Sequence, residues 1–452
     1  MVSLYSKVVS SLLFPLHEKL KKHDTVSIRK KLEKSQWQSP EQLVEAQQLR
    51  LQTFIKTITE HVPFYRDLFA QKQLAPQDVK TVADLSKLPF LDKATIAANF
   101  EALKSDIAGP LSRFNTGGSS GQPLIFLLGN ERVSYDVAEK WRATRWWDVD
   151  IGDKEIVAWG SPIELGAQDK VRLIRDKLFR SELIAAFDLT PEKILAFIEQ
   201  IRQTKPAMLF GYPSVFDLLA KTAEKQGIKM NDLGIKVAFV TSERLYPYQR
   251  ENIERIFGCP VANGYGGRDA GFIAHQCPQG GMHLSFEDIV VEIIDREGNP
   301  LPPGQSGEIV VTHLGTSEFP FVRYRTGDIA VMSDKQCACG RGLPMLESIE
   351  GRSTDFVVAA DGTILHGLSL IYILRDMETV DAFKIVQESK TLTRVQVVSK
   401  TGSVDQQMRD TISQGFKARL GNDVEIEIES VDDIAPEKSG KYRYVISKVD
   451  IT

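Results

Sequence analysis

Short apolar runs alternate with amphipathic segments from Asp153 onward. Runs rich in β-branched and aromatic residues, such as Glu155–Trp159, predict strands, whereas apolar positions at helical spacing, as in Pro213–Gln226, predict helices. Thr190 followed by Pro191 predicts a helix start, because threonine caps the first turn and proline fits the first helical position. Strands and helices that alternate over short links predict a layered α/β sheet with mostly parallel strands. The other elements predicted in this region are Lys170–Phe179, Leu183–Phe187, Ala207–Phe210, Val237–Val240, Pro247–Phe257 and Val261–Asn263.

The pattern is different on both sides of this region. Apolar positions in Gln42–Glu60 repeat at helical spacing, and Pro63 ends that helix because proline disfavours helix in the residue before it. We therefore expect a helical lead-in over residues 1–70. Residues 282–350 predict short strands without helices, such as Ile289–Ile294, and hence a β-rich subdomain.

The pattern of hydrophobic and polar positions changes again after Asp355. The turn Asp361-Gly362 between two β-rich runs predicts a hairpin, and helices and strands follow it. Together they indicate a compact α+β unit of about 100 residues, an ordinary domain size. We predict a large N-terminal α/β domain over residues 1–353 and a small C-terminal α+β domain over residues 354–452.

Composition narrows the class of protein only slightly. A chain of 452 residues is too long for one ordinary core, and its 42% hydrophobic and 26% charged residues are typical of globular proteins. The net charge of −4 gives no reason to expect a nucleic-acid partner. Four cysteines form no disulfide framework, which favours a reducing, cytoplasmic location. No apolar run approaches the roughly 20 residues of a transmembrane helix.

Residues 1–22 combine an apolar run with a basic group, Lys19, Lys21 and Lys22. A secretory signal places its positive charges before the apolar run, whereas here they follow it. The segment predicts an amphipathic helix. Such a helix either packs on the body of the protein or makes a peripheral contact with a membrane surface.

The glycine-rich loop Thr116-Gly117-Gly118-Ser119-Ser120-Gly121 lies between two apolar runs. Glycine permits a close backbone approach, and successive N–H groups and hydroxyls can surround an anion. A phosphate group is the expected ligand, and a flexible hairpin of small residues is the alternative. Gln122 stands where the common phosphate-loop motif has lysine, so the loop lies outside that motif.

Three further segments carry candidate site residues. Tyr265 and Gly266 follow a predicted strand, at the end of a sheet where ligands bind, and Asp269 after them offers a carboxylate for Mg²⁺. Asp328 lies at a predicted tight turn and could accept hydrogen bonds from ribose hydroxyls. Lys441 lies beside a glycine and could bring a positive charge to a phosphate. The alternatives are a surface carboxylate, an ordinary hairpin turn and a solvated lysine.

A Cys/His cluster is expected near the β-rich subdomain. Three thiolates and one imidazole are the composition of a closed tetrahedral zinc site. His275 is a rival ligand, and reduced cysteines packed in a core are the alternative to a metal site. Cys259 stands apart and is expected to pack in a core. The four cluster residues are Cys277, His283, Cys337 and Cys339.

Taken in order, these segments resemble the motifs of the adenylate-forming superfamily, which comprises acyl-CoA ligases, adenylation domains and luciferases. The motif segments are the glycine-rich loop, Asn263–Asp269, Tyr324–Asp328 and Ser439–Tyr444. The chain is more closely similar to the phenylacetate–CoA ligase branch, including its CapK-like members, which also carry similar Cys/His segments. Gly211–Ser214 and Ser242–Leu245 lie where the family has comparable segments. The resemblance covers nearly the whole chain.

The resemblance implies an ATP-dependent ligase that activates a carboxylic acid as an acyl-adenylate, releases pyrophosphate and passes the acyl group to CoA. The glycine-rich loop would hold the triphosphate, and Asp269 would bind Mg²⁺. Tyr265 and Gly266 would line the adenine and acyl pocket, and Asp328 would bind the ribose.

Four more residues acquire roles from the same resemblance. Arg352 would support the ribose-binding aspartate, and Ser242 and Glu243 would contribute to nucleotide binding. The C-terminal domain would be a mobile lid that brings Lys441 to the acyl carboxylate and the α-phosphate. Joining two anions requires such positive charge.

The chain departs from the family at two places. The superfamily usually has serine or threonine and then glutamate where this chain has Arg268-Asp269, and an acidic pair at the hinge where it has Thr354-Asp355. Two alternatives therefore stay open. The acyl group could pass to an amine, or the enzyme could adenylylate a hydroxyl. A non-catalytic binding protein on the same fold is a third possibility.

Overall fold

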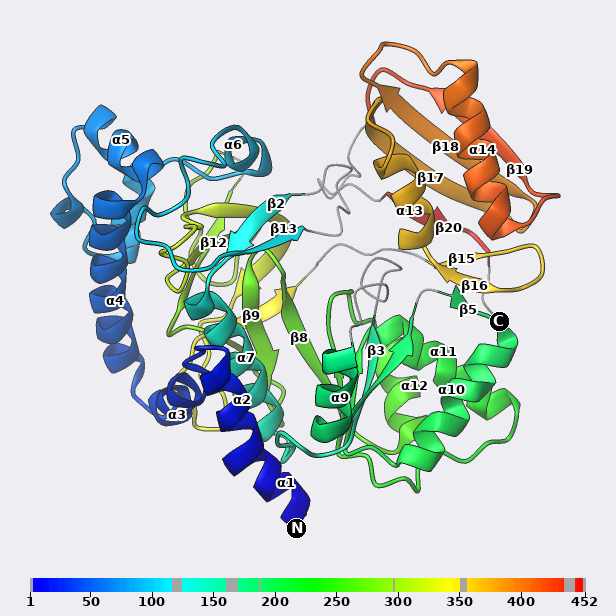
Figure 1. Cartoon of the computed structure of the whole chain (residues 1–452), viewed down its shortest axis with the longest axis horizontal. Coiled ribbons are helices and arrows are strands. Elements are labelled where there is room, and N and C mark those ends of the chain that lie inside the picture. Colours follow the sequence, from blue (N-terminus) through cyan, green and yellow to red (C-terminus); the bar gives the residue numbers. More distant parts are fainter. Residues whose placement is uncertain are drawn as a thin grey trace. The chain divides into compact units, whose positions relative to one another are not determined.

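The computed structural model describes residues 3–115, 124–159, 170–186, 188–295, 297–349, 356–434 and 444–449 (Figure 1). The chain divides into two compact units. The first unit comprises Met1–Thr116, Leu124–Asp153 and Ala262–Gly351, and the second comprises Gly117–Pro123, Lys154–Val261 and Arg352–Thr452.

Helices lead into the first unit, as predicted. Helix α4 spans Pro40–His61 and α5 spans Pro63–Gln71. Ser39 caps α4 by accepting a hydrogen bond from the Gln42 amide, and the Gln42 side chain accepts one from the Ser39 amide in return. The shorter helices before and after this pair are α1 Leu4–Val8, the π-helix η1 Val9–Leu13, α2 Phe14–Leu20, α3 Thr25–Ser35, η2 Pro76–Asp78, η3 Val82–Lys87 and α6 Lys93–Ala98.

The strands of the first unit are antiparallel, and they pack against one large apolar core. Their hydrogen-bonded order is β11 Ile289–Ile294, β12 Ser306–His313, β13 Tyr324–Met332, β14 Met345–Ile349, β10 Met282–Leu284, β9 Gly271–Gln276 and β8 Val261–Gly267. A hairpin of β1 Ser112–Asn115 and β2 Ile125–Leu128 flanks the glycine-rich loop in sequence, and helix α7 spans Asn130–Arg145. The described part of residues 282–350 forms strands without helices, as predicted, and β11 has the predicted bounds, whereas a separate subdomain stays a prediction.

Two motif positions were predicted wrongly. The Asn263–Gly267 segment does not follow a strand, because β8 continues through it to Gly267. Asp328 does not lie at the predicted tight turn between strands, because it lies within β13, which begins at Tyr324. Val310 of β12 pairs with Arg325 of β13, and Glu308 pairs with Ile329. Two steps along β12 therefore correspond to four along β13, so β13 holds extra residues in a bulge.

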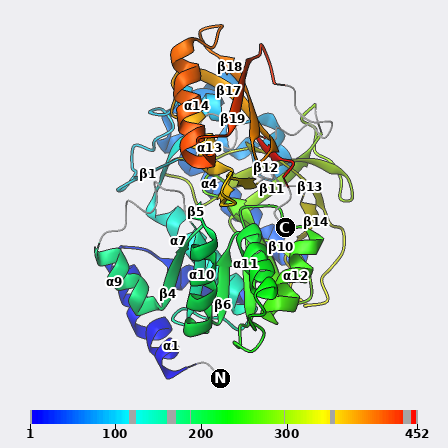
Figure 2. The same ribbon diagram turned by 90° about the vertical axis from the view of Figure 1, so that its right-hand side faces the viewer.

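The second unit contains the predicted parallel sheet. Strands β4 Ser181–Ala185, β3 Glu155–Trp159, β6 Met208–Gly211 and β7 Val237–Val240 pair in this order. The chain runs from β3 outward to β4 and then back past β3 to β6, so helix α9 lies on the sheet face opposite to the later helices (Figure 2). The helices are α9 Lys170–Phe179, α10 Pro191–Thr204, α11 Pro213–Lys225 and α12 Pro247–Phe257.

Most of these elements match the sequence prediction. Thr190 caps α10 by accepting a hydrogen bond from the Lys193 amide, and Pro191 occupies its first turn. Strand β4 begins and ends two residues earlier than predicted. Cys259 packs in the core of this sheet, as expected.

The C-terminal region has an apolar core of its own, formed by residues between Val357 and Val445. The predicted hairpin is present as β15 Phe356–Val358 and β16 Ile364–His366, and β16 also pairs with β5 Asp188–Leu189. The other elements are α13 Leu368–Arg375, β17 Val380–Ser389, β18 Leu392–Ser399, α14 Gln406–Leu420, β19 Glu425–Ser430 and β20 Val445–Ser447. The fold class is thus confirmed, whereas the domain boundary near residue 353 stays a prediction. Among the described helices, none has the length and apolarity that crossing a bilayer requires.

Candidate active site

Two tyrosines and two aspartates form a reciprocal pair of hydrogen bonds in the first unit. Tyr265 on β8 donates its hydroxyl hydrogen bond to Asp328 Oδ2 on β13 at 2.9 Å. Tyr324 on β13 donates its own to Asp269 Oδ2, just after β8, at 2.7 Å. Strands β14, β10 and β9 lie between β8 and β13 in the hydrogen-bonded order, so the sheet must curl to bring these side chains together. The structure therefore joins the second and third sequence motifs in one site.

Local backbone geometry places both carboxylates. The turn that carries Asp269 requires Gly266, because a Cβ there would lie 2.2 Å from the Gly271 carbonyl oxygen across the β8–β9 pair. In the β13 bulge Gly327 has a φ of +75°, and the Thr326 hydroxyl accepts a hydrogen bond from the Asp328 amide. Both aspartates are half-buried.

Arg132 on α7 holds the backbone of the Asp269 turn. Its guanidinium donates hydrogen bonds to the carbonyl oxygens of Asp269 at 3.3 Å and Arg268 at 3.2 Å. Its Nε is paired with the Asp136 carboxylate at 2.9 Å, and the side chain is 1% exposed. Arg132 was not predicted from the sequence, because a single arginine in a charged helical segment carries no distinguishing pattern.

Asp136 belongs to a buried polar network that also contains His313 and Asp288. The Gly315 amide donates to His313 Nδ1, which leaves the ring proton on Nε2, 3.5 Å from Asp288 Oδ2. Burial, with Arg132 nearby, lowers the pKa of His313 to about 3, so its ring is neutral at pH 7. Burial raises the pKa of Asp288 to about 7 against the opposing effect of Arg50.

The family-like segments of the second unit lie at the carboxyl ends of its parallel strands. Ser242 follows β7 with a φ of +71°, and the Glu243 carboxylate accepts a hydrogen bond from the Ser214 hydroxyl. Trp159 at the end of β3 stacks on Tyr212, just after β6, with ring centroids 4.8 Å apart. The strand order reverses between β3 and β6, and such a point in an open α/β sheet is where ligands bind.

The chemistry of the carboxylates Asp269 and Asp328 suits a nucleotide with its metal. Carboxylate oxygen is the preferred protein ligand of Mg²⁺, which is usually held by one or two carboxylates together with substrate phosphates. Asp269 is such a carboxylate, fixed by the Tyr324 hydroxyl and by the Ala270 amide. When bound, Mg²⁺ would neutralise phosphate charge.

The Cys/His cluster is assembled in the first unit, with its four ligand atoms within 4.8 Å of one another. Cys277 and Cys337 each begin a tight turn. The Gly280 amide donates a hydrogen bond to the Cys277 carbonyl oxygen, and the Gly340 amide donates one to the Cys337 carbonyl oxygen. An added Cβ at Gly281 would lie 2.6 Å from Cys337 Sγ, so only glycine leaves room for the sulfur there.

The spacing of the cluster is close to that of a zinc site. In a tetrahedral site with Zn–S near 2.3 Å and Zn–N near 2.0 Å, neighbouring ligand atoms lie roughly 3.5–3.8 Å apart. Here Cys277 Sγ lies 3.6 Å from Cys337 Sγ, and Cys339 Sγ lies 3.2 Å from His283 Nε2. His283 Nδ1 bonds the Leu343 carbonyl oxygen at 3.1 Å, which directs Nε2 into the cluster. The rival ligand His275 is not part of the cluster.

Several predicted residues lie outside the described part of the chain. They are the glycine-rich loop Thr116–Gly121, the hinge residues Arg352, Thr354 and Asp355, and Lys441. Their assigned roles stay predictions.

Comparison with known proteins gives two family matches, in the order expected. Residues 183–318 match a family described as AMP-binding enzyme, and residues 357–448 match the CapK C-terminal domain. The chain belongs to the adenylate-forming superfamily. Within it, this ATP-dependent adenylate-forming ligase is CapK-like, which confirms the resemblance seen in the sequence.

Individual relatives are similar to the ligase over most of its length. Protein CapK of Staphylococcus aureus is 24% identical over 417 residues, which cover 90% of each chain. Phenylacetate-coenzyme A ligase of Thermus thermophilus is 22% identical, covering 85% of this chain and 84% of the relative. A solved 2-hydroxyisobutyryl-CoA ligase, in complex with 2-HIB-AMP and CoA, has the same fold with a TM-score of 0.63, at 22% identity and 90% coverage of both chains.

We predict that Arg132 positions Asp269 in this ligase. Arg132→Lys keeps the charge but loses the fork that reaches two carbonyl oxygens, so adenylation should fall by roughly ten- to a hundredfold. The Mg²⁺ concentration needed for half-maximal rate should rise, since Asp269, the predicted Mg²⁺ ligand, is then displaced. Arg145→Lys, on the same helix but bonded to Glu33 and Asp150, serves as the control. An unchanged Mg²⁺ dependence in Arg132→Lys would contradict the assignment.

A second prediction concerns pH and Asp288. The pKa of Asp288 is raised from 3.8 to about 7, so between these values the folded state binds more protons than the unfolded chain. Its contribution to the free energy of unfolding is fully present below about pH 4 and is lost as the pH rises through about 7. Asp288→Asn should therefore lose less stability than the wild type between about pH 6 and about pH 8, measured by urea denaturation. Equal losses of unfolding free energy in the two proteins would contradict the raised pKa of Asp288.

Proposed function

We propose that the protein joins a carboxylic acid to ATP and then passes the acyl group to the thiol of CoA. In the first step a carboxylate oxygen attacks the α-phosphorus, and the bond to the departing pyrophosphate breaks. In the second step the thiol sulfur attacks the acyl carbon, and AMP leaves. The observation that carries the proposal is the reciprocal bonding of Asp269 and Asp328 by Tyr324 and Tyr265.

Each candidate site residue has a defined part in the proposed reaction. Asp269 would hold Mg²⁺ against the phosphates, and Asp328 would accept hydrogen bonds from the ribose hydroxyls. The stacked pair of Trp159 and Tyr212 offers an apolar surface where the strand order reverses, which suits a flat or apolar part of a ligand. Lys441 would supply positive charge as the carboxylate meets the α-phosphate.

Pyrophosphate exchange tests the first step. Labelled pyrophosphate should return into ATP only when a suitable acid from a panel of aromatic, aliphatic and sugar acids is present. Lys441→Ala should lower this exchange by on the order of a hundredfold to a thousandfold, because it removes a charge needed mainly in the transition state. Nucleotide binding, measured by calorimetry, should change little.

The control for this experiment is Lys335→Ala, which removes an exposed lysine of the first unit that is paired only loosely with Glu347, at 3.5 Å. Exchange in this variant should match the wild type. Full exchange in Lys441→Ala would exclude the proposed role of that lysine. If no acid supports exchange, the adenylation proposal itself is contradicted.

A second acceptor is supported by one specific observation. The C-terminal region matches the CapK C-terminal domain, and protein CapK is similar over nine tenths of both chains. The acceptor could accordingly be an amine or a hydroxyl. Mass spectrometry of products formed with and without CoA distinguishes an acyl thioester from an amide or an adenylylated alcohol.

We also propose that the Cys/His cluster holds a structural Zn²⁺. Burial and the neighbouring thiols raise the pKa of Cys277 to about 12, so a thiolate at Cys277 needs a cation beside it. The purified protein should contain one zinc per chain by atomic emission. Cys337→Ala should lose the metal and melt at a lower temperature, whereas Cys259→Ala, outside the cluster, should keep it. A Cys337→Ala protein with full zinc content would exclude this site.

A further inference from the structure

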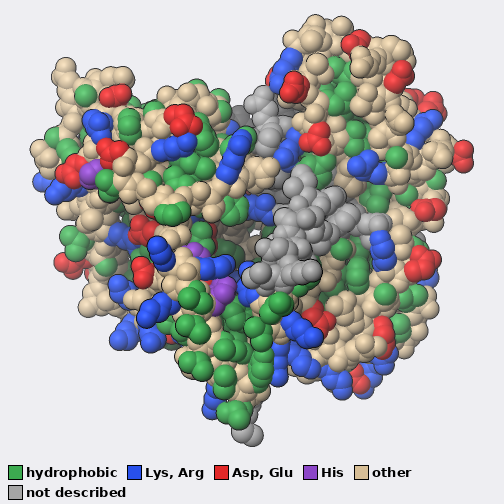
Figure 3. Space-filling model, in the orientation of Figure 1, with side chains coloured by type: hydrophobic (Ala, Val, Ile, Leu, Met, Phe, Trp, Pro, Cys, Tyr) green, Lys and Arg blue, Asp and Glu red, His purple; other side chains and the backbone are tan. Residues whose placement is uncertain are grey.

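An exposed apolar stripe runs along the helix formed by α1, η1 and α2. It consists of five side chains, each four residues from the next, with exposed fractions that are high for leucine and valine. They are Leu4 at 80%, Val8 at 43%, Leu12 at 62%, Leu16 at 53% and Leu20 at 77%. Single exposed apolar residues are common, but a continuous row of five indicates a binding surface. Figure 3 shows hydrophobic side chains gathered over these helices.

The π-helix keeps this stripe straight. In an α-helix, residues four apart drift by about 40° around the axis at each step, so five of them would spread over a wide arc. In η1, Val9–Leu13, hydrogen bonds reach one residue further, so each residue turns less around the axis and the drift is offset. The irregularity therefore serves to align the apolar positions.

The opposite side of the helix is already occupied. Ser6 donates hydrogen bonds to the Gly152 carbonyl oxygen at 3.1 Å and to Asp153 Oδ1 at 2.6 Å. Val9 and Phe14 are buried, and a Cβ on Gly152 would lie 2.6 Å from Val9. The helix is thus docked on the body of the protein, as the first of the two sequence interpretations expected, and still presents a second apolar face outward.

Positive charge surrounds the stripe. Residues 3–31 hold six lysines and one arginine against two carboxylates, although the whole chain has a net charge of −4. One of these carboxylates, Glu18, is buried and bonded to His17 and His23. All six lysines, by contrast, are exposed.

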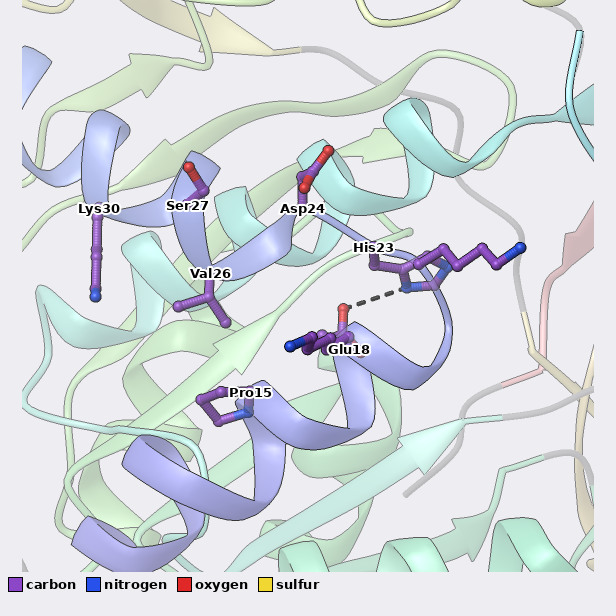
Figure 4. Close-up of a pocket in the computed structure, with 9 residues that line it drawn as sticks. Pro15, Glu18, His23, Asp24, Val26, Ser27 and Lys30 are labelled. Carbon is purple, nitrogen blue, oxygen red and sulfur yellow. Dashed lines mark hydrogen bonds and ion pairs between the residues drawn. The ribbon is translucent and has the colours of Figure 1, made fainter.

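A hollow beside the stripe concentrates this charge. It has a volume of about 580 Å³ and lies between α2 and α3, with Pro15 and Val26 on its wall (Figure 4). Lys19, Lys22 and Lys30 line it as well, together with the carboxylates of Glu18 and Asp24. Two apolar side chains and three ammonium groups, which outnumber the two carboxylates, match the chemistry of a phosphate joined to a lipid.

We propose that residues 4–31 bind the surface of a bilayer that contains anionic phospholipid. The stripe enters the acyl-chain boundary, and the lysines around it contact lipid phosphates, with the hollow accepting one head group. The helix from Leu4 to Leu20, about 25 Å long at 1.5 Å per residue, lies in the plane of the membrane, as amphipathic interfacial helices do. A second copy of the chain is a poorer partner, because the clustered lysines would repel one another and protein interfaces are depleted in lysine.

Flotation of the full-length protein with vesicles tests the proposal. Binding should be at least tenfold stronger to vesicles with about a third phosphatidylglycerol than to phosphatidylcholine alone, and high salt should weaken it. Leu12→Ser with Leu16→Ser should lower vesicle binding by at least tenfold. Lys19→Gln, Lys22→Gln and Lys30→Gln together should lower it by on the order of a hundredfold.

Matched controls separate this surface from general effects. Leu49→Ser changes another exposed leucine, 67% exposed on α4, and Lys56→Gln with Lys229→Gln and Lys335→Gln changes three exposed lysines elsewhere. These variants should bind vesicles like the wild type. Pyrophosphate exchange and thermal melting should stay unchanged in the stripe and lysine variants, because neither set touches the active site.

Two results would overturn the proposal. One is a wild-type protein that fails to float with anionic vesicles, or binds them no better than the Leu12→Ser, Leu16→Ser variant. The other is a dimer, found by light scattering, that this variant converts to a monomer, since a second copy would then cover the stripe.

Discussion

The reciprocal hydrogen bonds between two tyrosines and two aspartates are the constraint on which the candidate active site depends. Each motif strand supplies the tyrosine that orients the other's carboxylate, so neither carboxylate is placed by its own segment alone. The bonds require the antiparallel sheet to curl, the β13 bulge to turn Asp328 inward, and Arg132 to hold the turn at Asp269. Fixed hydrogen bonds of this kind orient charged groups before a ligand arrives, which lowers the reorganisation needed during reaction.

Elements that depend on local signals could be predicted from the sequence. Strands β3 and β7 and helix α12 have the predicted bounds, because their signals are local: apolar runs, caps and prolines. The four residues of the predicted Cys/His cluster do lie together, whereas the metal they would hold stays a prediction. Family motifs pointed to Tyr265, Asp269 and Asp328, although both segments that hold these residues were given the wrong local structure.

The parts that escaped prediction are non-local. Whether Gly266 lies in a turn or in a strand depends on its approach to Gly271 across the β8–β9 pair, and the bulge near Asp328 depends on register against β12. Arg132 acts through two carbonyl oxygens more than a hundred residues away in sequence. No periodicity or spacing along the chain encodes such contacts.

The central claim is that a carboxylate oxygen of the substrate acid becomes bonded to the α-phosphorus of ATP. The most direct measurement uses an acid whose carboxylate oxygens are labelled with a heavy isotope, together with ATP, Mg²⁺ and CoA, followed by mass spectrometry of the AMP released. The account predicts AMP that carries one heavy oxygen, because acyl transfer breaks the bond between the acyl carbon and that oxygen. AMP without label, formed while the acid is consumed, would contradict an acyl-adenylate intermediate.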